Sequence, residues 1–355
     1  MQFHRSALLA IVLLGTCQAL YAQEPAAHLP ALQGFLFGDV VYQARQRASN
    51  DGFLVGQMVG HGNARLSERV SFFGEFTASA RPDSYAFEVE RAILRYDFAD
   101  QLKISVGRYH TPISYWNTAY HHGLWLQTSV ARPEIIKVGG RFMPVHFVGA
   151  MAEGTLSGHA LSFSYEAGIG NGRGANVARA GDAGDLNRRR AAVLSARVRP
   201  GDLGLQIGGS MYFDHPTPAG IGISYDERIT TGHIVWDRGA PELIAEYANV
   251  RHEESATGTD FSSNGWYAHF GYRLPGALSQ WKPYARFERL DADAGDLAFG
   301  ASLEDYRAWV GGLRFDFDAL AALKAEYRRE RLGASPAVNG LYLQVAFAVP
   351  LSGGM

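Results

Sequence analysis

Apolar and polar residues alternate along much of this chain, in short runs separated by turns. In one such run Ala92, Leu94 and Tyr96 share one parity, and Arg91 and Arg95 share the other. Successive side chains of a β-strand point to opposite faces, so a period of two predicts strands. A strand with one apolar and one charged face needs different surroundings on its two sides. The pattern therefore predicts a sheet that separates an apolar medium from water.

Runs of this kind follow one another at regular spacing, and long amphipathic helical patterns are absent. The fold class predicted from them is all-β. The sixteen predicted strands are 35–46, 53–64, 69–80, 86–98, 102–110, 144–156, 159–169, 188–199, 203–213, 225–237, 241–251, 264–274, 281–291, 304–317, 320–332 and 340–350.

The connections between these runs alternate between short and long. Short ones include 99–101, 275–280 and 318–319, and long ones include 81–85, 111–143 and 170–187. An up-and-down barrel in an outer membrane has this rhythm, with tight turns on one rim and long loops on the other. Strands of about ten residues suit a tilted crossing of the bilayer, and closure removes the sheet edges. We predict a transmembrane antiparallel β-barrel of about 16 strands with a water-filled lumen.

The first residues have the pattern of a secretory signal peptide. Arg5 gives a positive start, 6–17 is apolar, and Ala22 is a small residue suited to cleavage. A lipoprotein signal with the motif Leu14-Gly15-Thr16-Cys17 is the weaker alternative, because Thr16 suits the position before the cysteine poorly. The predicted organisation is a signal peptide over 1–22, a short periplasmic lead over 23–33, and a barrel over 34–355 with an inward loop over 111–143.

Composition narrows the class further. The only cysteine is Cys17, which leaves with the predicted signal, so no disulfide framework is expected. The net charge of −2 gives no basic bias and argues against a nucleic-acid partner. The expected location is the outer membrane of a Gram-negative bacterium, and the expected partners are outer-membrane lipid and lipopolysaccharide.

The stretch 111–143 is the longest without clear alternation, and it is rich in Tyr, Trp and His. Long irregular connections in compact folds are usually functional. We predict that this loop folds into the lumen and constricts it, because charged rings in a narrow pore set ion preference. The alternative is an external cap. The predicted constriction residues are Arg108, His110, Arg132, Glu134, Lys137 and Arg141.

The charged parity of the strands is expected to line the pore. Basic residues outnumber acidic ones there, which predicts a mild preference for anions. The alternative is a wall of ion pairs, such as Arg286 with Glu288 or Arg328 with Glu326, which would be neutral; both stay open. The predicted lining residues are Arg91, Arg95, Lys103, Arg197, Arg273, Arg286, Arg314 and Arg328.

Three histidines, His110, His121 and His122, raise the question of a metal site. Metal ligands usually come with fixed geometry and supporting partners. Adjacent histidines without cysteine or paired carboxylates alongside are a weak pattern. We therefore expect hydrogen-bonding loop histidines, no metal and no cofactor.

Catalytic motifs are missing, since neither G-x-S-x-G nor H-E-x-x-H occurs in the sequence. The chain is therefore not expected to be an enzyme. The competing hypothesis is a hydrolase embedded in the barrel. Its candidates, Ser162, Ser164 and His159, are suggested by residue type alone, without supporting spacing.

The segment GRYHTPISYWNTAYHHGLWLQTSVARPE, residues 107–134, and the VERAILRYDF before it resemble proteobacterial outer-membrane porins. They look related to the phosphate-selective porin O/P family. The resemblance implies a sixteen-stranded barrel, a homotrimer, and passive diffusion of small hydrophilic solutes or anions. The arginine ladder and loop lysines of phosphate-specific members do not map onto this chain residue by residue, so phosphate selectivity is not carried over.

Overall fold

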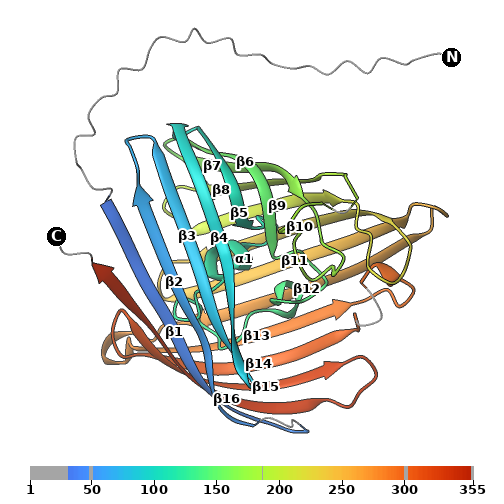
Figure 1. The fold of residues 1–355 in the computed structure, drawn as a ribbon. Coiled ribbons are helices and arrows are strands. Elements are labelled where there is room, and N and C mark those ends of the chain that lie inside the picture. Colours follow the sequence, from blue (N-terminus) through green and yellow to red (C-terminus); the bar gives the residue numbers. More distant parts are fainter. Residues whose placement is uncertain (1–30, 48–50, 186, 300–302, 353–355) are drawn as a thin grey trace, which may run out of the picture. The chain divides into compact units, whose positions relative to one another are not determined.

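The computed structural model describes residues 31–47, 51–185, 187–299 and 303–352. They form a closed barrel in which every strand pairs antiparallel with its neighbours in sequence, and the first strand pairs with the last (Figure 1). The predicted fold class, an all-β antiparallel barrel of sixteen strands, is confirmed.

Each strand overlaps one predicted run. The strands are β1 (Ala31–Arg45), β2 (Gly52–Arg65), β3 (Val70–Arg81), β4 (Ser84–Ala99), β5 (Leu102–His110), β6 (His146–Ser157), β7 (Leu161–Asn171), β8 (Ala191–Pro200), β9 (Leu205–Asp214), β10 (Tyr225–Asp237), β11 (Pro241–Glu254), β12 (Asp260–Tyr272), β13 (Trp281–Asp291), β14 (Tyr306–Asp316), β15 (Ala321–Leu332) and β16 (Val338–Ser352).

Helices are few and short. In the part of the chain that the structure describes they are α1 (Tyr115–Tyr120) and the 3-10 helices η1 (Glu134–Ile136), η2 (Gly276–Leu278) and η3 (Leu297–Phe299). Among the described residues, none of the helices combines the length and apolar character needed to cross a bilayer.

The two faces of the wall differ as the alternation predicts. In β12 the side chains of Trp266 and Phe270 are on the outer face, and Phe270 is half exposed. Tyr267 and His269, which lie between these two residues in the strand, are fully buried on the inner face. The same contrast recurs around the ring, so the outer face is an apolar belt and the inner face is polar.

Two connections differ from the prediction. The connection after β3, predicted to be long, is a tight turn at Pro82 and Asp83. The connection after β12, predicted to be short, is 273–280 and includes η2. Strand β1 begins at Ala31, inside the predicted lead of 23–33. The predicted signal peptide and its cleavage near Ala22 lie outside the described residues.

One irregularity in β4 matters for the interior. Glu75 of β3 pairs with Arg91, but the next residue, Phe76, pairs with Val89, so Glu90 is an extra residue in its strand. Such a β-bulge changes the parity of the strand. As a result Glu90 and Arg91 both contact inner-face groups, while Val89 remains exposed on the outer face.

Candidate functional site: a loop across the lumen and a histidine cluster

The segment 111–145 between β5 and β6 is tied to the far wall of the barrel. Ser114 caps the start of its helix α1, and the Ser114 hydroxyl accepts a hydrogen bond from the Asn117 backbone N–H. The backbone N–H groups of Tyr115 and Trp116 donate to the carboxylate of Glu246 in β11, at 2.7 and 2.9 Å. A carboxylate at this position satisfies free N–H groups and suits the positive end of the helix dipole.

Further anchors hold the rest of the segment against β13, β14 and β15. Arg314 donates to the carbonyl oxygens of Trp125 and Gln127, at 2.7 and 2.8 Å. The Val130 N–H donates to Glu326 at 2.9 Å. Strands β13 and β14 lie opposite β5 and β6 in the closed ring, so a segment bonded to both sides crosses the interior (Figure 1). We call 111–145 the crossing segment.

Polar cavities lie on both sides of the crossing segment. One, of about 290 Å³, is lined by α1 and by β8–β10, including Arg197 and Gln206 near the tight-turn rim. The other, of about 480 Å³, is lined by Glu90, Arg108 and His146, with residues of the long connection after β7. The segment thus stands between two water-accessible chambers.

The six predicted constriction residues have different hydrogen-bond and ion-pair partners. Arg132 donates to the side-chain oxygen of Asn117 at 3.0 Å. Lys137 pairs with Glu134 at 3.1 Å, and its side chain is exposed. Burial raises the pKa of Glu134 above its ordinary value.

The other three predicted constriction residues each contact a residue in a different part of the chain. Arg141 donates to the Phe299 carbonyl at 2.7 Å. Arg108 donates to Asp182 at 2.8 Å, and His110 stacks on His121 with ring centroids 3.6 Å apart.

The predicted lining cations are mostly paired with acids. Arg286 and Arg314 also lie beneath the crossing segment, so their side chains face the loop rather than open water. Lys103 is placed opposite Asp97 in the strand register. The ion pairs are Arg91–Glu75, Arg95–Asp97, Arg197–Glu166, Arg273–Asp316, Arg286–Glu288, Arg314–Asp316 and Arg328–Glu326.

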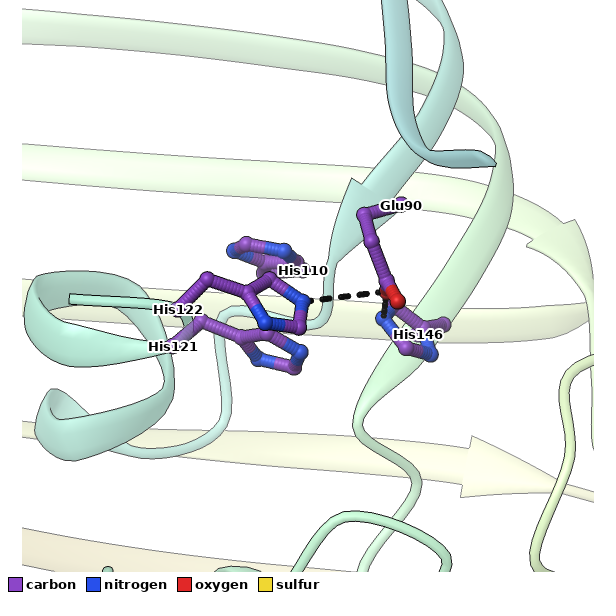
Figure 2. Close-up of side chains that lie close together, drawn as sticks. All are labelled: Glu90, His110, His121, His122 and His146. Carbon is purple, nitrogen blue, oxygen red and sulfur yellow. Dashed lines mark ion pairs between the residues drawn. The ribbon is translucent and has the colours of Figure 1, made fainter. Parts of the chain in front are cut away.

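Five ionisable side chains gather where the crossing segment leaves and rejoins the wall (Figure 2). Glu90 comes from the bulge in β4, His110 ends β5, and His146 begins β6 directly opposite His110. His121 and His122 follow α1. All five are buried, and one potential metal-binding atom of each lies within 4.8 Å of those of the others. We call these five residues the histidine cluster.

Hydrogen bonds fix two rings of the histidine cluster. His121 Nδ1 lies 2.7 Å from Asn117 Oδ1. The Asn117 amide nitrogen donates to two backbone carbonyls, of Thr111 and Val145, so its oxygen faces the ring. His122 Nδ1 lies 3.1 Å from the side-chain oxygen of Gln57.

An oxygen acceptor at Nδ1 requires the proton there. In the neutral form of such a ring the lone pair is at Nε2, the nitrogen that faces the cluster. Burial, followed by the nearby His110 and Arg132, holds the pKa of His121 well below its usual range.

Sequence reasoning named His110, His121 and His122 but missed Glu90 and His146. Strict alternation puts Glu90 on the opposite face from Arg91, and only the bulge brings it inside. His146 is far along the chain from His110. The strand ends carried the missing signal, because strands that flank a loop and pair with each other bring their end residues together.

No serine hydroxyl is hydrogen-bonded to a histidine ring among the described residues. The hydroxyl of Ser164, a candidate of the hydrolase hypothesis, lies 3.0 Å from the Thr155 hydroxyl instead. His159 is exposed in the turn that precedes β7.

No protein-family model matches the sequence, and no curated protein matches it. Solved structures do match the fold. An anion-selective porin from Comamonas acidovorans has a TM-score of 0.62 and 11% identity, covering 90% of this chain and 99% of its own. The trimer form of OmpT of Vibrio cholerae has a TM-score of 0.62 and 14% identity, covering 90% and 100%. OmpF of Salmonella typhi has a TM-score of 0.59 and 15% identity, covering 90% and 97%.

These likenesses extend over nearly the whole of each chain but are low in identity. They show that this chain has the sixteen-stranded barrel fold of outer-membrane porins.

Proposed function

We propose that this chain is an outer-membrane porin, a channel through which small hydrophilic solutes diffuse passively without chemical change. The observation that carries the proposal is the reversal of polarity across a closed wall. An apolar outer belt suits lipid, and closure leaves no unpaired backbone edge to face it. The polar inner face and the polar cavities on both sides of the crossing segment suit a water-filled path.

In this proposal the crossing segment forms the constriction. It narrows the lumen by crossing it, and its bonds to Glu246, Arg314 and Glu326 keep it rigid. A fixed constriction limits solute size without a gating motion. Lys137 is the cation of this segment whose side chain is most open to water, so it is the charge that passing ions meet.

Selectivity is proposed to be weak. An anion-selective porin is among the similar structures, and basic residues outnumber acidic ones on the inner parity. Most of these basic side chains nevertheless form ion pairs with acidic side chains of the wall. A neutral pair acts on a passing ion only at short range, because opposite charges screen each other. We therefore propose a small anion preference and no phosphate-specific ladder.

Planar-bilayer recording of the purified protein tests the channel. Stepwise conductance that scales with salt concentration, with a reversal potential slightly toward anions, is the expected result. Liposome swelling in sugars of increasing size gives the cut-off. A protein that inserts as a folded barrel and gives neither current nor swelling contradicts the proposal.

A homotrimer is the proposed assembly. The resemblance of 107–134 to porins supports it, as does the trimer form of the OmpT structure. Mass measurement in mild detergent distinguishes a trimer from a single chain, and a stable monomer that conducts fully would contradict the trimer alone.

A further inference from the structure

We propose that the histidine cluster, Glu90, His110, His121, His122 and His146, is a binding site for a divalent first-row transition-metal ion, with Zn²⁺ as the ion that best suits it. This departs from the expectation of no metal drawn from the sequence. The proposal rests on local geometry and does not depend on whether the barrel conducts.

The donor set selects the class of metal. Four imidazoles and one carboxylate offer nitrogen donors with one oxygen. Magnesium and calcium ions prefer sites made of oxygen atoms. Imidazole suits zinc, copper, nickel and iron, and zinc is commonly held by histidines with a carboxylate.

The geometry is close to that of an occupied site. A four-coordinate zinc ion with bonds of about 2.0–2.2 Å holds its ligand atoms roughly 3.4 Å apart. In the cluster the candidate atoms lie within 4.8 Å of one another, and Glu90 Oε2 is 2.7 Å from His146 Nε2 and 3.2 Å from His122 Nε2. Small side-chain rotations would bring four of the five to bonding distance.

The polar atoms that face inward lack hydrogen bonds. In the described part of the chain, Glu90 Oε2 and the Nε2 atoms of His110, His121, His122 and His146 are all buried without a partner of hydrogen-bond geometry. Buried polar atoms are normally satisfied, and several unsatisfied ones in one place need a common explanation. A single cation at the centre would satisfy them together.

The side-chain atoms of the cluster that face away from its centre form hydrogen bonds, as those of metal ligands usually do. His121 is fixed by Asn117 and His122 by Gln57, as described above. The second oxygen of Glu90 accepts a hydrogen bond from the Thr77 hydroxyl at 3.0 Å. Partners of this kind orient ligands and set the tautomer that leaves Nε2 free.

Neighbouring charges set a limit on affinity. Arg91 is paired with Glu75, which also lies 3.4 Å from His110 Nε2. Arg108 is paired with Asp182 at 2.8 Å and also lies 3.7 Å from Glu90 Oε2. Arg132 has no carboxylate within ion-pair distance among the described residues, so its charge weighs most against a cation. We expect an exchangeable ion, bound more weakly than in a closed structural zinc site.

Ions can reach the cluster from the chamber of about 480 Å³, whose lining includes Glu90 and His146. That chamber lies on the side of the long connections, because residues of the connection after β7 also line it. A metal ion entering from this rim would therefore reach the cluster through this chamber.

The test is zinc binding to the full-length folded protein, purified in detergent and first treated with a chelator. We expect one Zn²⁺ per chain by elemental analysis and titration. Co²⁺ in its place should give the visible absorption of a nitrogen-rich, low-coordinate site. The double variant His121→Ala/His122→Ala should bind at least about a hundredfold more weakly, since even loss of an outer partner costs 10–100-fold.

Two controls separate this site from adventitious binding. His159→Gln removes an exposed histidine in a turn, and His252→Gln removes a buried histidine outside the cluster, so both should bind zinc as the unchanged protein does. If the double variant fails to fold, Glu90→Gln, which preserves shape and the acceptor for Thr77, should still weaken binding at least about tenfold. The circular dichroism spectrum of a β-sheet protein shows that each variant has folded as a barrel.

Three results overturn the proposal. One is a folded, unchanged protein that binds no zinc. Another is full binding by the folded double variant or by Glu90→Gln. The third is loss of binding in His159→Gln. None of them bears on conduction, so the porin proposal would stand or fall separately.

Discussion

Among the buried histidine networks in the described part of this barrel, two are built in opposite ways. His252 of β11 has a carboxylate on each ring nitrogen, Asp296 at 2.6 Å and Glu227 at 2.8 Å, and Glu227 also pairs with Arg173 at 3.0 Å. Each ionisable group of this network therefore has an oppositely charged or hydrogen-bonding partner. In the histidine cluster, Glu90 is within ion-pair distance of only two of the four rings, those of His122 and His146, and the Nε2 atoms of all four rings lack a partner of hydrogen-bond geometry.

This difference implies different roles: the His252 network links strands to loops, whereas the histidine cluster has atoms that a ligand could bind. The His252 network joins β10 and β11 to two long connections, because Asp296 and Arg173 lie in the connections after β13 and β7. It has no vacant donor or acceptor to offer a ligand. The histidine cluster has several, pointed at one place. The residues of both regions are buried, so the difference lies in whether their inner atoms already have hydrogen-bond partners.

The largest expected effect comes from breaking the cross-link. Glu227→Ala leaves Arg173 and His252 buried without their shared partner. Removing one member of a buried charge pair typically costs about 3–5 kcal/mol. We expect a loss of that size in the unfolding free energy, measured by urea titration in lipid vesicles.

The matched variant is Glu90→Ala, studied without metal. Here Arg108 keeps Asp182, so we expect a smaller loss, of about 1–3 kcal/mol, the usual cost of a buried group left unpaired. Equal losses of unfolding free energy in the two variants would show that the two networks stabilise the barrel to the same extent, which would contradict this comparison.

Zinc should stabilise one network and not the other. A ligand at a hundred times its dissociation constant raises the free energy of unfolding by about 2.7 kcal/mol. We expect saturating zinc to raise the melting temperature of the chelator-treated protein and of His252→Gln. The His121→Ala/His122→Ala variant should show no rise, and a rise there would place the ion elsewhere.

A smaller effect is expected from the partner of His122. Gln57→Leu removes the acceptor at Nδ1 and should weaken zinc binding by about 10–100-fold. Gln57→Glu keeps an acceptor and should retain the affinity. If the two variants bind alike, the hydrogen bond does not orient His122.

The smallest expected effect is on ion preference. Lys137→Glu reverses an exposed charge on the crossing segment and should move the reversal potential a few millivolts toward cations, because most wall charges are already paired. Reversing Arg273, which is paired with Asp316 on the wall, is the control for an ion pair. A large shift with Lys137→Glu would mean that this one charge dominates the pore.

The strands could be predicted from the sequence because alternation is a local property of each run. Every run from 35–46 to 340–350 overlaps an observed strand. The pairing of His110 with His146 could have been anticipated, since β5 and β6 flank one loop. The inward position of Glu90 could not, because a single extra residue changes parity and leaves no clear trace in the pattern.

The charges of the lumen were harder to predict for a physical reason. Parity places Arg286 and Arg314 on the inner face, as observed, but parity says nothing of what covers them. The crossing segment uses these cations to bind its own carbonyl groups and hydroxyls. Whether an inner charge meets water or a loop is decided by tertiary contacts, which a period of two does not encode.

The central claim is that solutes pass beside the crossing segment. Thr118 of α1 is exposed and lines the chamber near β8–β10, and the chain has no cysteine after Cys17. Single-channel recording of Thr118→Cys, with a charged thiol reagent added during the trace, therefore tests it directly. The account predicts a stepwise fall in conductance, with no change for Trp309→Cys on the outer face. Unchanged current after full modification of Thr118→Cys would contradict it.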